Sequence, residues 1–187
     1  MSGRFAASAR LPRSGNAALA AGALVQLALG AEFVLAGLSK AVDADFTTQF
    51  RSFLQASPGA KMGLLAPLMQ GLVVPNAGLM AQFAKYTELF GGVILMLVAL
   101  EVLRRRLAEP FGAQHVYEPL VALLSAAAAF ALGGMSLTIY LLEGLPLPTV
   151  NAGFAFTSPV PIELFLVPLA LCVAWLEFAR YRALREA

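Results

Sequence analysis

Four segments of this 187-residue chain, residues 17–38, 77–100, 120–142 and 160–178, are long apolar runs with few charges. A membrane-spanning helix needs about 20 mainly apolar residues. Every backbone polar group must be hydrogen-bonded in lipid, so such segments form helices, and the alternation of membrane β-strands does not occur in them. We therefore predict an all-α polytopic membrane protein, a four-transmembrane-helix bundle that forms one domain over residues 1–187.

The composition supports this fold class. Hydrophobic residues make up 59% of the chain and charged residues 13%, whereas soluble domains carry about 25% charged residues. The apolar content excludes intrinsic disorder. The net charge of +2 and the lack of a basic patch with interleaved aromatics exclude nucleic acid as a partner.

Basic residues predict the orientation of the bundle, because cytoplasmic loops are enriched in Lys and Arg. One side of the bundle has nine, namely Arg4, Arg10, Arg13, Arg104, Arg105, Arg106, Arg180, Arg182 and Arg185. The other side has three, namely Lys40, Arg51 and Lys61. We expect both termini to be cytoplasmic and the first helix to be retained, since it is longer than a signal-peptide core.

The first outer loop, residues 39–76, is too long to be a simple connection. Phe46, Phe50, Phe53 and Leu54 recur at helical spacing among polar residues, which predicts an amphipathic helix on the membrane surface or on the bundle. Residues 62–74 are apolar but too short to span, so we expect a re-entrant, interfacial or buried segment. The second outer loop, residues 144–161, is expected to form an ordered cap because its aromatic side chains need burial.

Ionisable side chains lie inside two of the apolar segments. Glu32 and Lys40 belong to the first, and Lys85 and Glu88 belong to the second. At 1.5 Å per residue, Glu32 lies about 9 Å below the outer end of its helix, and Lys85 and Glu88 lie about 12 and 16 Å below theirs. Such groups are costly in lipid unless they are paired or face a cavity. We expect Glu32, Lys85 and Glu88 to meet in the outer half of the bundle, either as structural ion pairs or as a site for a quinone headgroup, a proton or a small ligand.

The sequence has few residues that could bind a haem or a metal ion. The only histidine is His115, and the only cysteine is Cys172, which we expect in the core. We therefore expect no haem or metal in this chain. Glu101, Glu118 and Glu177 are expected to be solvated at helix ends, and six glycines are expected to allow close helix approach, namely Gly30, Gly37, Gly91, Gly92, Gly133 and Gly134.

Two short motifs resemble the DoxX/DoxD family of membrane proteins. The first helix reads QLALG at residues 26–30 and GLSK at 37–40, similar to the family's Arg, Gly and Gly-x-x-Lys, with Gln26 in place of the Arg. The second helix reads YTELFGG at 86–92, similar to the family's Glu followed by Gly. The Asn- and Pro-containing residues 151–159 resemble the region before the last helix of DoxD-like members, and the four-helix layout covers nearly the whole chain.

This resemblance implies a redox association. DoxD-like proteins are membrane subunits of thiosulfate:quinone oxidoreductase, and DoxX-like proteins are associated with membrane oxidoreductase complexes. By this likeness, Lys40 and Glu88 are motif positions and Glu32 is not. The implied location is the bacterial inner membrane, as a multi-pass protein.

We thus expect the membrane subunit of a quinone-linked oxidoreductase, with lipid and other protein subunits as partners. Glu88 or Glu32 would relay protons, and Lys85 would stabilise the reduced quinone. Lys40 and Gln26 are further candidate contacts to the quinone. The alternative is a non-catalytic accessory subunit of a larger membrane complex, and a transporter is a weaker third candidate.

Overall fold

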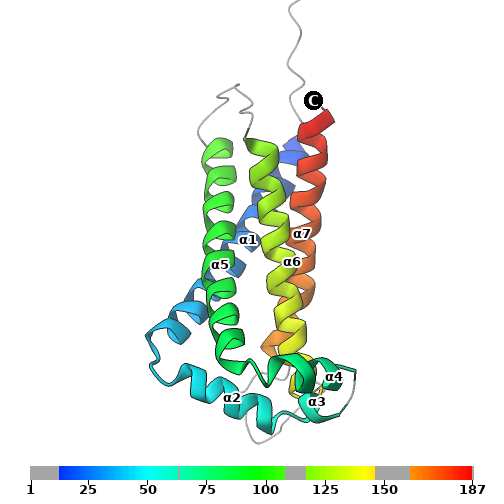
Figure 1. Cartoon of the computed structure of the whole chain (residues 1–187). Coiled ribbons are helices and arrows are strands. Elements are labelled where there is room, and N and C mark those ends of the chain that lie inside the picture. Colours follow the sequence, from blue (N-terminus) through cyan, green and yellow to red (C-terminus); the bar gives the residue numbers. More distant parts are fainter. Residues whose placement is uncertain (1–12, 63, 108–116, 146–160, 187) are drawn as a thin grey trace, which may run out of the picture.

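The computed structural model describes residues 13–62, 64–107, 117–145 and 161–186, and these are almost entirely helical (Figure 1). Within these residues, four helices are long and apolar enough to cross a membrane. They are α1 (Arg13–Val42), α5 (Ala77–Leu107), α6 (Glu118–Leu142) and α7 (Ile162–Glu186). The expectation of an all-α protein with four membrane-length helices is confirmed.

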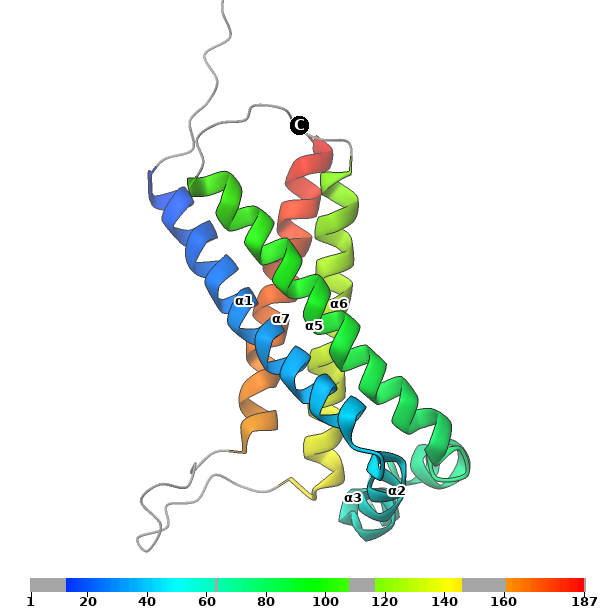
Figure 2. The same ribbon diagram turned by 90° about the vertical axis from the view of Figure 1, so that its left-hand side faces the viewer.

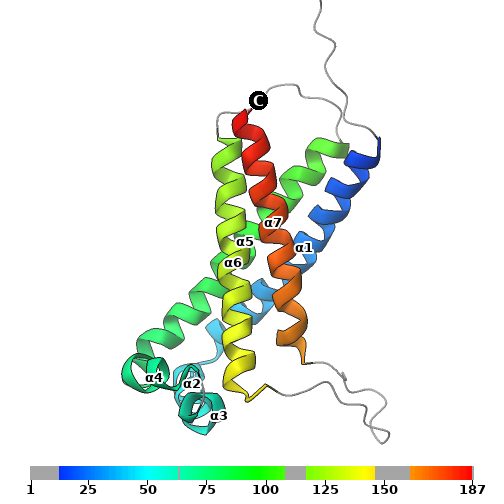
Figure 3. The same ribbon diagram turned by 90° about the vertical axis from the view of Figure 1, so that its right-hand side faces the viewer.

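The four long helices form two antiparallel pairs that cross each other. α1 packs along α5 and α6 packs along α7, and the two pairs are held mainly through α5 and α6. Figures 2 and 3 show both pairs from the side. α1 begins and α7 ends at the same end of the bundle, which we call the terminal end. The opposite end carries the short helices, and we call it the α2 end.

The core lies where the two pairs cross. It contains buried side chains from all four long helices, namely Leu29, Phe33, Leu95, Ala129, Leu132, Ala170 and Val173. Burying side chains at the crossing fixes how the pairs are placed, whereas the outward faces carry exposed leucines and phenylalanines. In a water-soluble protein such surfaces would be a liability, but in a bilayer they face lipid.

The segment between α1 and α5 folds as four short elements at the α2 end, namely α2 (Phe46–Ala56), α3 (Pro58–Lys61), α4 (Ala66–Leu68) and a π-helical turn, η1 (Met69–Val73). α2 is the predicted amphipathic helix, with Leu54 buried and with Phe50 and Phe53 packed beside it. Met69 of η1 joins the same cluster. The apolar segment 62–74 therefore packs against the bundle through Met69 at the α2 end.

Close packing of α1 on α5 depends on glycine. A β-carbon on Gly37 would lie 2.7 Å from the backbone nitrogen of Leu89, and one on Gly92 would lie 2.7 Å from that of Val34. Real β-carbons do not come this close, so the predicted close approach is confirmed here. Gly134 differs, because nothing lies within 4 Å of its would-be β-carbon.

The long helices are longer than their apolar runs, extending from 17–38 to Arg13–Val42, from 77–100 to Ala77–Leu107, and from 160–178 to Ile162–Glu186. Ion pairs three or four residues apart support the added turns, such as Arg104 with Glu101 and Arg182 with Glu186. Most of the expected cap at 144–161, residues 146–160, lies outside the described residues. His115 and residues 1–12 also lie outside them.

Candidate functional site

An ion pair between Lys40 of α1 and Glu88 of α5 is the most buried charge contact at the α2 end. Lys40 Nζ lies 2.5 Å from Glu88 Oε2, and the side chain of Glu88 is only 4% exposed against 28% for Lys40. The close contact of Gly37 with Leu89 lies one turn of α1 from Lys40 and one residue from Glu88. The glycine contact thus places the two helices near enough for the pair to form.

This ion pair lies in the wall of a cavity of about 530 Å³, which we call the α2-end cavity. Its volume falls in the range of small-molecule sites, about 300–1,000 Å³. α2, η1, α5 and α6 supply the apolar lining, namely Phe46, Phe50, Phe53, Leu54, Met69, Val73, Met80, Phe83, Ala84, Ala131, Met135, Ile139 and Leu142. The polar lining is limited to Lys40, Gln49, Thr87, Glu88 and Thr138.

The polar lining outside the ion pair is partly committed already. Thr138 Oγ1 donates a hydrogen bond to the carbonyl oxygen of Gly134 at 2.8 Å, and Gln49 Nε2 donates one to Asp43 Oδ2 at 2.9 Å. Lys40 uses one of its ammonium hydrogens on Glu88, so its other hydrogens remain available to a ligand. The strongest donor in the cavity wall is therefore Lys40, with the Glu88 carboxylate beside it.

Glu32 and Lys85, two of the expected site residues, are not brought to Glu88. Lys85 does not line the α2-end cavity, and its Nζ lies 5.0 Å from the centre of the Tyr86 ring. Glu32 is exposed and makes no hydrogen bond or ion pair with any residue that the structure describes. The expected meeting of Glu32, Lys85 and Glu88 is replaced by the contact of Glu88 with Lys40. Counting residues along each helix gave the depth of these charged side chains. It did not give the direction in which each side chain points from its helix, and that direction decides which charges meet.

Gln26 is buried far from the cavity. Its Nε2 donates hydrogen bonds to the carbonyl oxygen of Leu95 at 3.1 Å and to Ser125 Oγ at 3.0 Å. Gln26 is fourteen residues from Lys40, which is about 21 Å along α1. These bonds tie α1 to α5 and α6, so the position of Gln26 is that of a satisfied core amide and not that of a contact in the α2-end cavity.

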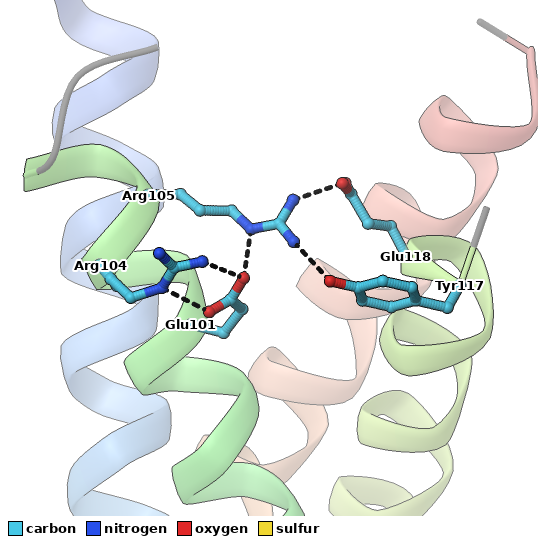
Figure 4. Close-up of polar contacts among 5 residues, drawn as sticks. All are labelled: Glu101, Arg104, Arg105, Tyr117 and Glu118. Carbon is cyan, nitrogen blue, oxygen red and sulfur yellow. Dashed lines mark hydrogen bonds and ion pairs between the residues drawn. The ribbon is translucent and has the colours of Figure 1, made fainter. Parts of the chain in front are cut away.

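A second charge cluster joins α5 to α6 at the terminal end (Figure 4). Glu101 accepts hydrogen bonds from Arg104 Nε at 2.8 Å and from Arg105 Nε at 2.5 Å. Arg105 also pairs with Glu118 and contacts the hydroxyl group of Tyr117 at 3.4 Å. Each charged side chain in Figure 4 has an oppositely charged side chain beside it, and such paired charges stabilise the contact between α5 and α6.

The expected exposure is wrong for three side chains. Glu118 and Glu177 are 8% and 5% exposed and not solvated, because they pair with Arg105 and Arg180 across or along helices. Cys172 is exposed on α7 and not in the core. A helix with apolar residues on all sides gives no hydrophobic stripe from which a buried face could be read.

Sequence reasoning missed the rest of the α2-end cavity. The aromatic spacing of α2 was visible, but the role of α6 was not, since Met135 and Thr138 resemble any other residues of a membrane helix. In the described parts of the chain, no group of three or more His, Cys, Asp and Glu side chains is placed to hold a metal ion.

Searches against protein-family models, curated proteins and solved structures gave no match to this chain.

Proposed function

We propose that this protein is the membrane subunit of a quinone-linked oxidoreductase, and that the α2-end cavity holds the quinone. The observation that carries the proposal is the single ion pair, Lys40 with Glu88, in the wall of a mainly apolar cavity of about 530 Å³. An apolar wall with a few convergent polar groups suits a ligand that is mostly apolar with one polar part. A quinone, with its carbonyl headgroup and apolar tail, is such a ligand, and the likeness to the DoxX/DoxD family at Lys40 and Glu88 supports the choice.

The chemistry of the pair fits a headgroup that gains charge and protons. Reduction of a quinone to a quinol would take two electrons from a redox partner subunit and two protons from water at the membrane surface. The Lys40 ammonium would donate a hydrogen bond to a headgroup oxygen and balance the negative charge that reduction places there. Glu88, held beside it, would carry a proton to that oxygen. The apolar side chains of α2 and α6 would exclude water from the pair.

The same proposal includes the placement in the membrane. The terminal end carries Arg105, Arg180, Arg182 and Arg185, so we assign it to the cytoplasm. The α2 end, with its amphipathic helix, then lies at the outer surface of a bacterial inner membrane, and the quinone would enter from the lipid. Both chain termini would be cytoplasmic.

The test is binding of a short-chain benzoquinone to the purified chain in lipid nanodiscs. Lys40→Met and Glu88→Gln are expected to weaken binding at least tenfold, because each removes one member of the pair in the cavity wall. Lys85→Met is the matched control, since it removes a lysine from the half of α5 that contains Glu88 but does not change the lining of the α2-end cavity. Equal loss in all three variants, or no loss in the first two, would contradict the proposed site.

A second candidate function is a non-catalytic accessory subunit of a larger membrane complex. The exposed position of Glu32 on a membrane-length helix favours it, because that carboxylate has no partner in the described chain. Normal assembly of the complex, with no quinone bound by this chain, would distinguish this function from the first.

A further inference from the structure

Glu32 lies deep within the candidate membrane span Ala17–Val42. It is ten residues from Val42, which is about 15 Å along α1, and eight residues, about 12 Å, from Lys40. Its side chain is exposed and has no hydrogen bond or ion pair within the described residues. A carboxylate facing lipid at this depth is costly, and ionisable groups in membrane helices are almost always paired or directed at a protein interior or water.

Glu32 belongs to a continuous exposed line on α1, which we call the α1 stripe. It consists of residues alternately four and three positions apart, namely Ala21, Val25, Ala28, Glu32, Leu35 and Ser39. The five steps average 3.6 residues, the turn of an α-helix, so the stripe runs straight along one side of α1. The small side chains at several positions permit the close approach that membrane helices use.

The residues that the structure describes leave this flank of α1 exposed. Gly30 and Gly37 place a different face of α1 against α5. α7 reaches α1 near Gly22, whose would-be β-carbon lies 3.1 Å from Leu176, and the two helices diverge towards the α2 end (Figures 2 and 3). Glu32 lies ten residues beyond Gly22 in that direction. The Glu32 side chain is therefore exposed on a side of α1 that does not pack on α5.

Neither Lys40 nor Lys85 of a second copy of this chain supplies the missing cation. Lys40 is already paired with Glu88. Gly37 packs against Leu89 in the antiparallel pair, so Lys85 lies level with residue 41 of α1, about 13 Å from the level of Glu32. A two-fold axis along the membrane normal preserves these heights, so it would bring Glu32 to another Glu32 and not to a lysine.

We propose that the α1 stripe binds a transmembrane helix of a different subunit, and that a Lys or Arg of that helix pairs with Glu32. The negative charge of Glu32 requires a positive charge on the partner helix, and the depth of Glu32 in the span sets the depth of that basic residue. This docking surface is on the lipid side of α1, apart from the α2-end cavity. It therefore holds whether or not the cavity binds a quinone.

The test uses the full chain in its own membranes, with a photoreactive benzophenone amino acid introduced at Ala28 or at Leu35 on the stripe. Phe130, an exposed residue of α6, is the control position. We expect irradiation to join both stripe positions, and not the control, to a membrane helix of another protein that carries a Lys or Arg at the depth of Glu32. Capture of a protein without such a helix would overturn the proposal.

Charge exchange completes the test. Glu32→Lys is expected to lower the yield of the cross-linked product at Leu35 at least tenfold, equivalent to about 1.4 kcal/mol of binding free energy. Replacing the partner's basic residue by Glu should restore the yield. If Glu32→Lys prevents insertion, Glu32→Leu, which suits lipid, takes its place and must show the same loss. Cross-linking between two copies of this chain, no product above the control, or an unchanged yield would each refute the inference.

Discussion

Replacing Lys40 by Met removes the cation that pairs with the Glu88 carboxylate, the only one to do so among the described residues. The two changes that break this pair are not equivalent, because the Glu88 side chain is 4% exposed and the Lys40 side chain is 28% exposed. Without Lys40, the carboxylate is left buried among apolar side chains. Without the Glu88 charge, the lysine can extend towards the membrane surface, since long basic side chains bend towards water.

The burial of the two groups sets the expected magnitudes. Removing one partner of a buried pair costs about 3–5 kcal/mol when the remaining charge is uncompensated. We expect Lys40→Met to lower the free energy of unfolding by about 3 kcal/mol, at the lower end of that range, because the carboxyl group can take up a proton. Glu88→Gln should cost about 1.5 kcal/mol, the lower end of the range for a hydrogen bond to a charged group, because the Gln side chain can still accept a hydrogen bond from Lys40. The double variant Lys40→Met with Glu88→Leu should lie within about 1 kcal/mol of the unaltered chain.

The assay is reversible unfolding in mixed detergent micelles, followed by helical circular dichroism, for these chains and for Glu88→Leu, which completes the double-mutant cycle with Lys40→Met. The predicted order of stability is the unaltered chain and the double variant together, then Glu88→Gln, then Lys40→Met. Equal losses in Lys40→Met and Glu88→Gln, or losses of Lys40→Met and Glu88→Leu that simply add in the double variant, would refute the reasoning from burial.

Three other perturbations test the packing and the charges. Gly92→Ala should lower the free energy of unfolding by about 1–3 kcal/mol, because the added β-carbon meets the backbone of α1. The β-carbon of Gly134→Ala meets nothing, so this variant should be neutral or stabilising by less than about 1 kcal/mol. Thermal unfolding in detergent measures both. Arg105→Ala should cost about 2 kcal/mol in the same assay because it removes the cation that pairs with both Glu101 and Glu118, and Arg105→Lys should recover part of the loss. Burial, followed by a nearby carboxylate on α7, raises the pKa of Glu143, so the folded state binds the proton more tightly than the unfolded state does. Stability should therefore fall as the pH rises from about 4.5 through that raised pKa, and a pH series of unfolding midpoints should show a smaller fall for Glu143→Gln.

The positions of the four long helices could be predicted from the sequence because membrane burial depends on hydropathy over about 20 residues, which a single sequence records directly. The helix ends could not, since they depend on ion pairs such as Arg104 with Glu101 that extend the helix past its apolar run. α2 was predictable because its phenylalanines recur on one face.

The depth of each charged side chain in the membrane could be predicted from the sequence, but the direction in which it points from its helix could not. Glu32 and Glu88 both lie in apolar runs, yet Glu88 faces Lys40 and Glu32 faces outward. Each position on a helix turns by about 100°, so Glu32 lies about 80° around α1 from Lys40, on the same broad side of the helix, yet only Lys40 reaches α5. The hydropathy of α1 is nearly the same on all sides and gives no sign of which face packs on α5. Gly37 and Gly92 did carry that signal, since close helix approach needs small residues on the contacting faces.

Photolabelling with an azido-benzoquinone, followed by mapping of the labelled residues in the purified chain in nanodiscs, tests the proposed quinone site most directly. The account predicts labels confined to the lining of the α2-end cavity, on residues such as Phe50, Met80 and Met135, and lost in Lys40→Met but kept in Lys85→Met. Labels scattered over the lipid-facing surfaces, or a cavity label that persists without Lys40, would contradict the assignment of this cavity and its ion pair to a quinone.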